Sequence, residues 1–266
     1  MPTDDVLQEL FSIRGKVAVV TGGTRGIGLM IAEAYVRAGA KVYISSRKAE
    51  VCEQVAADLS EVGECLALPA NLSTEEECRR LADEVAGREG SLNILVNNAG
   101  ATWGAPMADF DDAAWNRVLD LNVKGLFHLT RFLVPALEAA GSLDDPARVI
   151  NLGSIGGLAV PSHESYSYSA SKAAVHHMTR VLAHHLGPKN ITVNAIAPGA
   201  FPTKMMASSL AEHGPEIEAA AAIGRIGRPD DMAGTAIFLS SRAGSYLTGT
   251  VIEVDGGTSQ ARALRG

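Results

Sequence analysis

The sequence has 266 residues, of which 47% are hydrophobic and 20% charged, so it can bury a large core and has the composition of an ordinary globular protein. Its 23 basic and 30 acidic residues give a formal net charge of −7, which argues against broad binding to nucleic acid or anionic membranes. No apolar run reaches the roughly 20 residues of a membrane span, and the acidic start is unlike a signal peptide, so we expect a cytoplasmic protein.

Short apolar runs alternate with longer amphipathic segments along the chain. The runs are nearly continuous in Val, Ile, Leu and Ala, as strands covered on both faces are, and they predict strands at 16–22, 41–46, 65–70, 92–100, 148–154, 191–199 and 250–257. The amphipathic segments predict helices at 26–38, 48–62, 74–88, 112–140 and 165–186. This alternation predicts an α/β fold with a Rossmann-type, doubly wound sheet of about seven parallel strands flanked by helices.

No repeat or linker divides the chain. We therefore expect one domain over 15–266, preceded by an N-terminal extension at 1–14, with an excursion at about 200–226 that serves as a substrate lid. The three cysteines form no CxxC pair and would lack a fourth ligand as a metal site, so we expect reduced, partly buried thiols at Cys52, Cys65 and Cys78.

A glycine-rich turn separates the first predicted strand from the first helix. Gly22, Gly26 and Gly28 stand where a chain needs a tight turn, close approach to a pyrophosphate and close packing of helix on strand. Glycines alone are weak evidence because they also form plain turns, but this strand–turn–helix context is the one that the motif requires. The turn predicts dinucleotide binding.

The end of the second predicted strand indicates which dinucleotide binds. An acidic residue at this place usually binds the ribose 2′-hydroxyl, whereas this chain has Ser46 and Arg47 and no carboxylate before Glu50. Arg47, together with Arg25 from the glycine turn, would neutralise a 2′-phosphate, so we predict NADP(H). The alternative is that both arginines are solvated surface charges.

The stretch Tyr166 to Lys172 contains a candidate acid. Tyr168 and Lys172 are four residues apart and share a helical face, whereas Tyr166 is out of phase with the lysine. A phenol needs a neighbour that stabilises its anion to transfer protons near neutral pH, and an ammonium or a serine hydroxyl provides this. Ser154, at the end of a predicted strand, supplies such a hydroxyl. A tyrosine and lysine alone would be an ordinary surface pair.

Taken together, these motifs resemble the short-chain dehydrogenase/reductase family over about Gly15 to Gly257. The resemblance rests on TGGTRGIG (21–28), NNAG (97–100), Ser154, Tyr168-x-x-x-Lys172 and PG (198–199). It implies a catalytic tetrad of Asn122, Ser154, Tyr168 and Lys172. In that scheme Tyr168 protonates the carbonyl oxygen and Ser154 polarises the carbonyl. Lys172 lowers the pKa of Tyr168 and binds the nicotinamide ribose, and Asn122 positions a relay water.

The resemblance also implies further contacts with the cofactor. Asn71 stands where the family usually has Asp beside the adenine, and its amide should preserve adenine binding. Besides the glycines, arginines, Tyr168 and Lys172 named above, the implied cofactor-binding residues are Thr24, Ile27, Ser46, Asn71, Leu72, Asn98, Ala99, Gly100, Pro198, Gly199 and Thr203.

Within the family the chain looks most like NADPH-dependent 3-oxoacyl reductases of the rhamnolipid-pathway type. This finer resemblance rests on TWGAP, PARVINLGS, PGAFPTKM and GRIGRPDDMA, and it implies reduction of a 3-oxoacyl thioester to the 3-hydroxyacyl form. The expected substrate pocket is apolar, although each aromatic could instead be a core or subunit contact; its residues are Trp103, Ser154, Pro161, Tyr166 and Phe201.

Two other functions remain open at this stage. The start LFS…GKVAVVTG also resembles gluconate-type polyol dehydrogenases, and a dinucleotide-binding regulator would bind NADPH without turnover. Acyl carrier protein is a weakly supported partner, because Asp144 and Asp145 lie on the surface that would meet it and the nearby cations are few: Arg131, Arg148 and Lys189.

The resemblance further implies a homotetramer. A cluster of histidines, which we expect at subunit contacts rather than around a metal, follows the predicted catalytic tyrosine at His176, His177, His184 and His185.

Overall fold

The computed structural model describes residues 3–161 and 164–261 and contains one seven-stranded sheet with the order β3-β2-β1-β4-β5-β6-β7. Every neighbouring pair of strands is parallel. The predicted doubly wound α/β fold is confirmed. Each strand lies inside its predicted range, except that β5 begins one residue earlier, and several strands are shorter than predicted: β1 (Val17–Thr21), β2 (Lys41–Ser45), β3 (Cys65–Ala67), β4 (Ile94–Asn97), β5 (Ala147–Leu152), β6 (Ile191–Pro198) and β7 (Val251–Val254).

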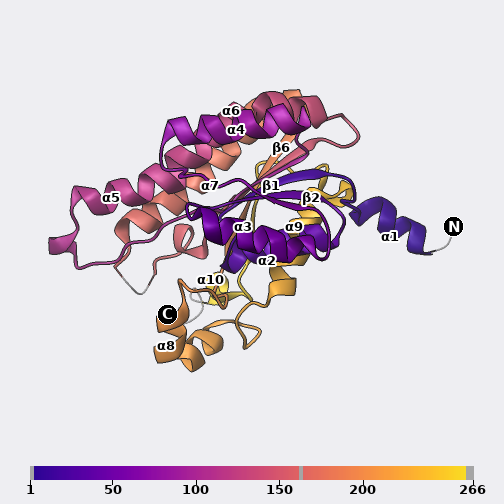
Figure 1. The fold of residues 1–266 in the computed structure, drawn as a ribbon. Coiled ribbons are helices and arrows are strands. Elements are labelled where there is room, and N and C mark those ends of the chain that lie inside the picture. The colour runs from indigo at the N-terminus through magenta and orange to yellow at the C-terminus, as the bar shows by residue number, and fades with distance from the viewer. Residues whose placement is uncertain (1–2, 162–163, 262–266) are drawn as a thin grey trace.

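Helices cover both faces of the sheet (Figure 1). Successive residues of a strand point to opposite faces, so Val19 belongs to one core cluster and Val20 to the other. The helices on the Val20 face are α2 (Gly26–Arg37), α3 (Ala49–Ser60) and α9 (Pro229–Ser240), and those on the Val19 face are α4 (Glu75–Glu89), α6 (Leu126–Ala140) and α7 (Tyr166–Leu186). Burial on both faces explains the continuous apolar strands.

One predicted helix is interrupted. The range 112–140 contains α5 (Asp112–Leu119), then a π-helical turn (Asp120–Gly125), then α6. A Cβ atom on Gly125 would lie 2.1 Å from the Leu72 carbonyl oxygen, so glycine lets the turn pack against the segment that follows β3. Single π turns inside helices are often found at functional sites, and this one carries Asn122.

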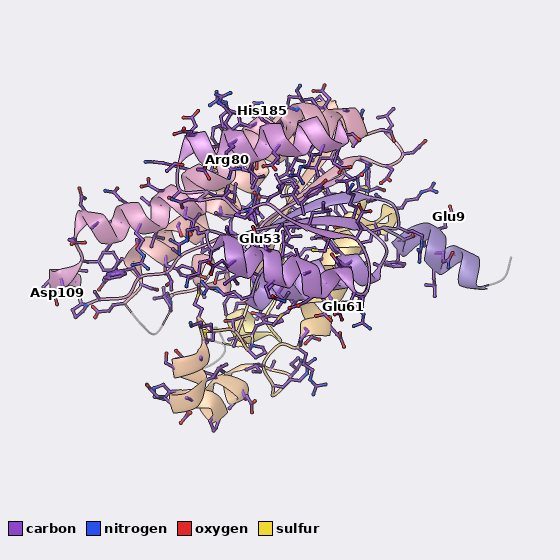
Figure 2. The ribbon with its side chains drawn as sticks, viewed as in Figure 1. Glu9, Glu53, Glu61, Arg80, Asp109 and His185 are labelled. Carbon is purple, nitrogen blue, oxygen red and sulfur yellow. The ribbon has the colours of Figure 1, made fainter. Side chains whose placement is uncertain are left out.

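Two segments outside the sheet are helical. The predicted N-terminal extension contains α1 (Thr3–Phe11), with residues 1–2 outside the described residues, and the predicted excursion at 200–226 contains α8 (Ala207–Ala220). Figure 2 shows Glu9 on α1 and Asp109 in the loop before α5 at opposite ends of the molecule. The remaining short helix near the C-terminus is α10 (Thr258–Ala261). No helix among the described residues has the length and apolar character needed to cross a membrane.

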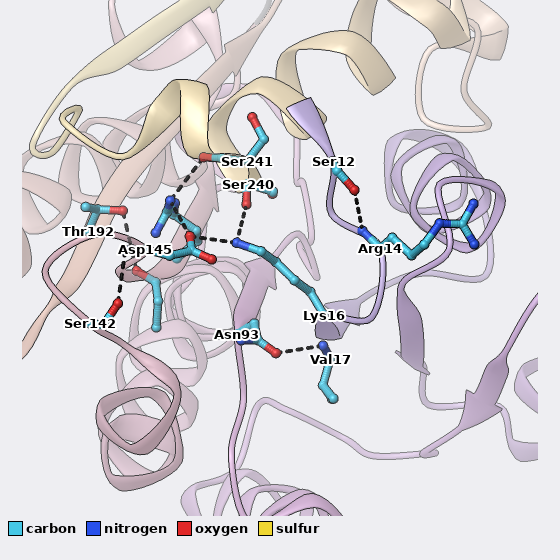
Figure 3. A network of polar contacts seen from close by, with 12 residues as sticks. Ser12, Arg14, Lys16, Val17, Asn93, Ser142, Asp145, Thr192, Ser240 and Ser241 are labelled. Carbon is cyan, nitrogen blue, oxygen red and sulfur yellow. Dashed lines mark hydrogen bonds and ion pairs between the residues drawn. The ribbon is translucent and has the colours of Figure 1, made fainter. Parts of the chain in front are cut away.

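A polar network holds the amino-terminal edge of the sheet (Figure 3). Asp145 accepts from Lys16 at 2.8 Å and from Arg148 at 3.0 Å, and Arg148 also donates to the Ser241 carbonyl oxygen at 3.0 Å. These contacts join the starts of β1 and β5 to the end of α9. Arg148 is 1% exposed, so the prediction that it is a surface cation is wrong; the Asp145 side chain is 46% exposed but lies at this edge of the sheet.

Candidate active site

The predicted site residues gather at the opposite, carboxyl-terminal edge of the sheet. Strands β1, β4, β5 and β6 are consecutive neighbours, and the glycine turn, NNAG, Ser154 and PG follow their carboxyl ends in that order. The strand order reverses between β1 and β4, where open α/β sheets bind ligands.

The glycine turn has a backbone that other residues would strain. Gly22 and Gly26 adopt φ values of +65° and +54°. A Cβ atom on Gly28 would lie 2.3 Å from the Gly22 carbonyl oxygen, which is closer than any side chain permits. The amide groups at the start of α2 are left at the sheet edge, so this turn fits the pyrophosphate of a dinucleotide. Thr24 and Ile27 lie in the same turn and are half-buried.

Thr21, which the sequence reasoning missed, locks this turn to the end of β4. Its hydroxyl oxygen accepts from the backbone N–H groups of Asn98 and Ala99, both at 2.9 Å. The Asn98 side-chain amide donates to the carbonyl oxygens of Thr21 and Gly22 at 2.8 and 3.2 Å. The amide nitrogen of Asn98 therefore shapes the cofactor turn. Its expected contact with the cofactor stays a prediction, as do those of Ala99 and Gly100.

The end of β2 presents free positive charge. Arg25 immediately precedes α2 and Arg47 follows β2; both are exposed, and neither forms an ion pair within the described part of the chain. Thr21 pairs in register with Ser45, so the two arginines follow adjacent strand ends. The Ser46 hydroxyl donates to the Lys48 carbonyl oxygen at 3.4 Å.

The residues expected around the adenine divide between surface and core. Asn71 is exposed, and its side-chain oxygen accepts from the Ser73 hydroxyl at 2.9 Å. Leu72 is 5% exposed and packs in the core cluster below the sheet edge. Packing holds the Leu72 side chain in the core, and the expected contact of this residue with the cofactor stays a prediction.

The segment after β6 returns to the glycine turn. A Cβ atom on Gly26 would lie 3.2 Å from the Thr203 methyl carbon, so Thr203 sits directly against the turn. Gly199 packs against Asp255, where a Cβ atom would lie 2.7 Å from the Asp255 Cβ, and Pro198 ends β6 in the buried layer. The structure thus brings together the pyrophosphate turn and the predicted cofactor residue Thr203.

Ser154 and Tyr168 converge above Gly156. A Cβ atom on that glycine would lie 3.4 Å from Ser154 Oγ and 3.7 Å from Tyr168 Cε1. Burial raises the pKa of Tyr168, and a hydrogen bond with the Ser154 hydroxyl acts in the opposite direction. Tyr168 therefore keeps its proton at neutral pH, which suits a general acid.

Lys172 lies one turn further along α7 and is 6% exposed. Its Nζ donates to the Leu152 carbonyl oxygen at 2.6 Å and lies 5.6 Å from the centre of the Tyr168 ring. Burial lowers the pKa of Lys172 to about 8. For Tyr168 the effect of burial outweighs the Ser154 hydrogen bond and the net direction is upward; the expected lowering of the Tyr168 pKa by Lys172 stays a prediction.

Asn122 ties three segments together. Its side chain exchanges two hydrogen bonds with the Ala101 backbone, at 2.8 and 2.9 Å, and donates a third to Ser171 Oγ at 2.9 Å. Ser171, which the sequence reasoning also missed, lies on α7 beside Lys172 and donates to the Tyr168 carbonyl oxygen at 2.7 Å. Asn122 is 2% exposed, so its amide is held rigidly.

The expected pocket residues fall into two groups. The first group is at least partly exposed to solvent. Trp103 is 38% exposed, with the Arg117 guanidinium 5.2 Å from the centre of its ring, and Pro161 is half-buried. Tyr166 is also half-buried, and its hydroxyl donates to Glu164 at 2.7 Å. Phe201 is 1% exposed and packs in the core against Gly227, so its predicted place in the pocket wall is wrong.

The histidines and cysteines also have different surroundings. His176 is buried, whereas the other three members of the cluster are exposed. Within the described ranges no group of three or more His, Cys, Asp or Glu side chains is arranged to hold a metal ion. The cysteines are free and buried: Cys52, Cys65 and Cys78.

Comparison with known proteins agrees with this geometry. The family described as "Enoyl-(Acyl carrier protein) reductase" matches residues 22–259. The chain is 46% identical to the rhamnolipids biosynthesis 3-oxoacyl-[acyl-carrier-protein] reductase of Pseudomonas aeruginosa, over 93% of this chain and 97% of that protein. It is 34% identical to the short-chain dehydrogenase/reductase PhomF of Diaporthe leptostromiformis, over 95% of this chain and 94% of that one. The chain belongs to the short-chain dehydrogenase/reductase family.

The structural comparison gives the same result for this short-chain dehydrogenase/reductase. The Pseudomonas aeruginosa RhlG/NADP active-site complex superposes with a TM-score of 0.91 at 44% identity, covering 94% of this chain and 99% of that one. The protein is thus an oxidoreductase acting on C=O and CH–OH groups.

Proposed function

We propose that this enzyme uses NADPH to reduce the keto group of a 3-oxoacyl thioester, giving the 3-hydroxyacyl product. The observation that carries the proposal is the meeting of the Ser154 hydroxyl with the half-buried Tyr168 side chain, one helical turn from Lys172 and at the sheet edge that holds the glycine turn. The substrate class is supported by the named activity of the Pseudomonas aeruginosa relative.

The side chains divide the work of the reduction. The Ser154 hydroxyl donates a hydrogen bond to the keto oxygen and orients it toward Tyr168. Bound NADPH supplies the hydride that adds to the carbonyl carbon. The Tyr168 phenol gives its proton to the oxygen, whose negative charge grows as the hydride arrives. Lys172 and Asn122 hold this helix and the adjoining loop in place and supply polar groups for restoring the proton on Tyr168.

Two exposed arginines support NADP(H) as the cofactor. Arg25 and Arg47 are free of ion pairs in the described structure and follow adjacent strand ends. An acidic residue in place of Arg47 would repel a 2′-phosphate, whereas two guanidinium groups neutralise it and offer paired donors. The RhlG relative forms a complex with NADP, which also supports this choice.

The mouth of the site is apolar, which favours an acyl chain over a sugar acid. Three large apolar side chains stand exposed on segments that follow β4, β5 and β6: Trp103 at 38%, Leu158 at 43% and Met205 at 52%. In the same proposal the segment 200–226 covers the bound chain. Helix α8 in this segment has no buried residue, so few contacts oppose its movement.

The charges near the surface favour a small thioester over an acidic carrier protein. Arg131 pairs with Glu75 at 3.4 Å, Lys189 pairs with Glu138 at 2.7 Å, and Arg148 is buried. None of the cations that the sequence offered is left free to steer an acidic partner. We therefore propose a coenzyme A ester as the preferred carrier.

A substrate panel tests the proposal. NADPH oxidation would be followed with acetoacetyl-CoA, longer 3-oxoacyl-CoA esters, the same acyl groups on acyl carrier protein, a cyclic ketone and a keto-sugar acid. We expect the highest kcat/KM with a 3-oxoacyl-CoA ester and no turnover by Tyr168→Phe. A preference for the sugar acid or the cyclic ketone would overturn the substrate class, and full activity of Tyr168→Phe would overturn the mechanism.

We further propose a cytoplasmic homotetramer. Free, buried Cys52, Cys65 and Cys78 suit a reducing compartment. Phe127 on α6 and Val181 on α7 are 41% and 43% exposed, and both would be covered by a neighbouring subunit. Light scattering coupled to size-exclusion chromatography measures the mass; a monomer would contradict the assembly.

A further inference from the structure

His176 is a buried imidazole that the proposed mechanism does not use. It lies on α7 one turn after Lys172 and is 3% exposed. Its Nε2 accepts a hydrogen bond from the backbone N–H of Ser154 at 3.4 Å. Its other ring nitrogen, Nδ1, has no hydrogen-bond partner in the described structure. Among the described residues, the hydrogen bond of this buried ring that meets ordinary distance and angle limits goes to the backbone of the proposed catalytic serine.

Two glycines make room for the imidazole. A Cβ atom on Gly153 would lie 2.1 Å from His176 Nε2, and one on Gly157 would lie 3.0 Å from His176 Cε1 and 2.6 Å from the Lys172 carbonyl carbon. These glycines stand on either side of the turn that begins at Ser154. The turn thus closes directly onto the His176 ring, with no side chain between them.

The electrostatic surroundings keep the ring neutral. Burial lowers the pKa of His176 to about 4, and the positive charges of Lys172 and Arg180 on the same helix act in the same direction. Glu253 on β7 is the charged group that opposes them. Because the neutral ring accepts at Nε2, the hydrogen of the ring must be on Nδ1.

The orientation of the Ser154 backbone decides where its hydroxyl lies. Ser154 is extended, with φ −172° and ψ 151°, and its Oγ also accepts from the Gly156 N–H at 3.1 Å. The same hydroxyl lies beside the Tyr168 side chain and opposes the rise in the Tyr168 pKa. A small rotation of the Ser154 peptide would therefore separate the two proposed catalytic groups.

We propose that His176 is a positioning residue of the active site, whose imidazole accepts the Ser154 amide hydrogen and so holds the Ser154 hydroxyl against Tyr168. The inference rests on the roles proposed above for Ser154 and Tyr168. It assigns His176 no contact with substrate or cofactor: it acts through Ser154.

Three variants test this role. His176→Leu fills the site but cannot accept a hydrogen bond, His176→Gln offers an acceptor oxygen close to the position of Nε2, and His177→Leu changes the exposed neighbour as a control. With NADPH and acetoacetyl-CoA, we expect His176→Leu to lose about 10- to 100-fold in kcat, as small misplacements of reacting groups do. The Kd for NADPH should stay unchanged, His176→Gln should recover most of the rate, and His177→Leu should match the parent.

The pH profile separates positioning from a purely structural role. Oxidation of 3-hydroxybutyryl-CoA by NADP⁺ needs the Tyr168 phenolate, which the Ser154 hydroxyl stabilises. The rising limb of the rate should therefore move to higher pH in His176→Leu and stay in place in His176→Gln. Unchanged kcat and pH profile in His176→Leu, or equal losses in the Leu and Gln variants, would overturn the inference.

Two further measurements keep the result interpretable. Full activity of Ser154→Ala would show that the proposed mechanism itself fails, whereas an inactive Ser154→Ala beside a fully active His176→Leu would overturn only the role of His176. Nitrogen-15 NMR of the His176 ring is measured on the parent protein, so it depends neither on activity nor on whether a variant folds. We expect the Nδ1–H tautomer at neutral pH; an Nε2–H tautomer would overturn the proposal.

Discussion

The Asn122 side-chain amide donates to Ser171 Oγ at 2.9 Å and thereby joins the π-helical turn to the helix that carries Tyr168 and Lys172. The same asparagine holds the Ala101 backbone through two hydrogen bonds. One buried amide thus fixes the relative positions of the loop after β4, the π-helical turn before α6, and α7. Ser171 is as much a part of this arrangement as the asparagine.

The first prediction concerns Ser171→Ala. Removing the hydroxyl leaves the Asn122 amide with one partner fewer in a buried position, so the π turn and α7 should lose their fixed spacing. We expect kcat to fall about tenfold or more, with little change in the Kd for NADPH.

Ser167→Ala is the matched control for this variant. Ser167 is also buried on α7, but among the described residues its hydroxyl makes one weak bond, of 3.5 Å, to the Ala114 carbonyl oxygen. Steady-state kinetics should show a parent-like kcat for Ser167→Ala. Equal losses in both variants would contradict a specific role for Ser171.

The second prediction concerns the glycine turn. Gly28→Ala places a Cβ atom 2.3 Å from the Gly22 carbonyl oxygen and from Asn98 Nδ2, so the turn must open. We expect fluorescence titration to show a loss of at least about 100-fold in affinity for NADPH, since the turn backbone approaches the pyrophosphate closely.

Gly87→Ala provides the contrasting control. Gly87 lies inside α4, and a Cβ atom there meets nothing within 4 Å. Alanine should therefore raise the free energy of unfolding by about 0.5–1 kcal/mol without changing NADPH affinity. A Gly28→Ala protein that binds NADPH normally would contradict the close packing of this turn.

The third prediction concerns cofactor choice. Replacing Arg25 and Arg47 by alanine removes two exposed arginines that follow β1 and β2 and form no ion pair in the described part of the chain. We expect kcat/KM with NADPH to fall about 10- to 100-fold, while kcat/KM with NADH changes little, because only NADPH carries the 2′-phosphate. Arg37→Ala, at the end of α2, is the control. Parallel losses with both cofactors would contradict a phosphate contact.

Much of the fold could be predicted from local pattern. The continuous apolar strands and the Gly22-to-Gly28 turn report directly on burial and backbone conformation, and both were located correctly. The π turn at 120–125 could not be seen, because its amphipathic pattern continues from α5 into α6. Its signal is the contact of Gly125 with the Leu72 carbonyl oxygen, which exists only once the chain has folded.

For the site, the sequence predicted the spacing of the residues but not how deeply each one is buried. The spacing of Tyr168 and Lys172 places them correctly on one helix, but spacing does not report burial, which sets the direction of both pKa values. Phe201 was assigned to the pocket because aromatic residues suit both pockets and cores, and only its packing against Gly227 decides between them. Arg148 was predicted to be a surface cation because arginines are usually exposed, and only the folded structure shows that it is buried.

The last prediction concerns Lys172 and the pH dependence of stability. Burial lowers the pKa of Lys172 to about 8 from its ordinary 10.5. Between these two values the unfolded state binds more protons than the folded state, so this residue makes the free energy of unfolding rise as the pH rises from about 8 to 10.5. Below pH 8 both states are protonated, and the charged, buried amine is a constant destabilising contribution.

Lys172→Met removes this contribution. In urea unfolding, the free energy of unfolding of the variant should exceed that of the parent by the largest amount at pH 7. This difference should shrink steadily as the pH rises through the window set by the two pKa values. Lys189→Met removes an exposed lysine and controls for the loss of one positive charge. If the stability difference between Lys172→Met and the parent stayed constant from pH 7 to 10, Lys172 would not titrate as its burial requires.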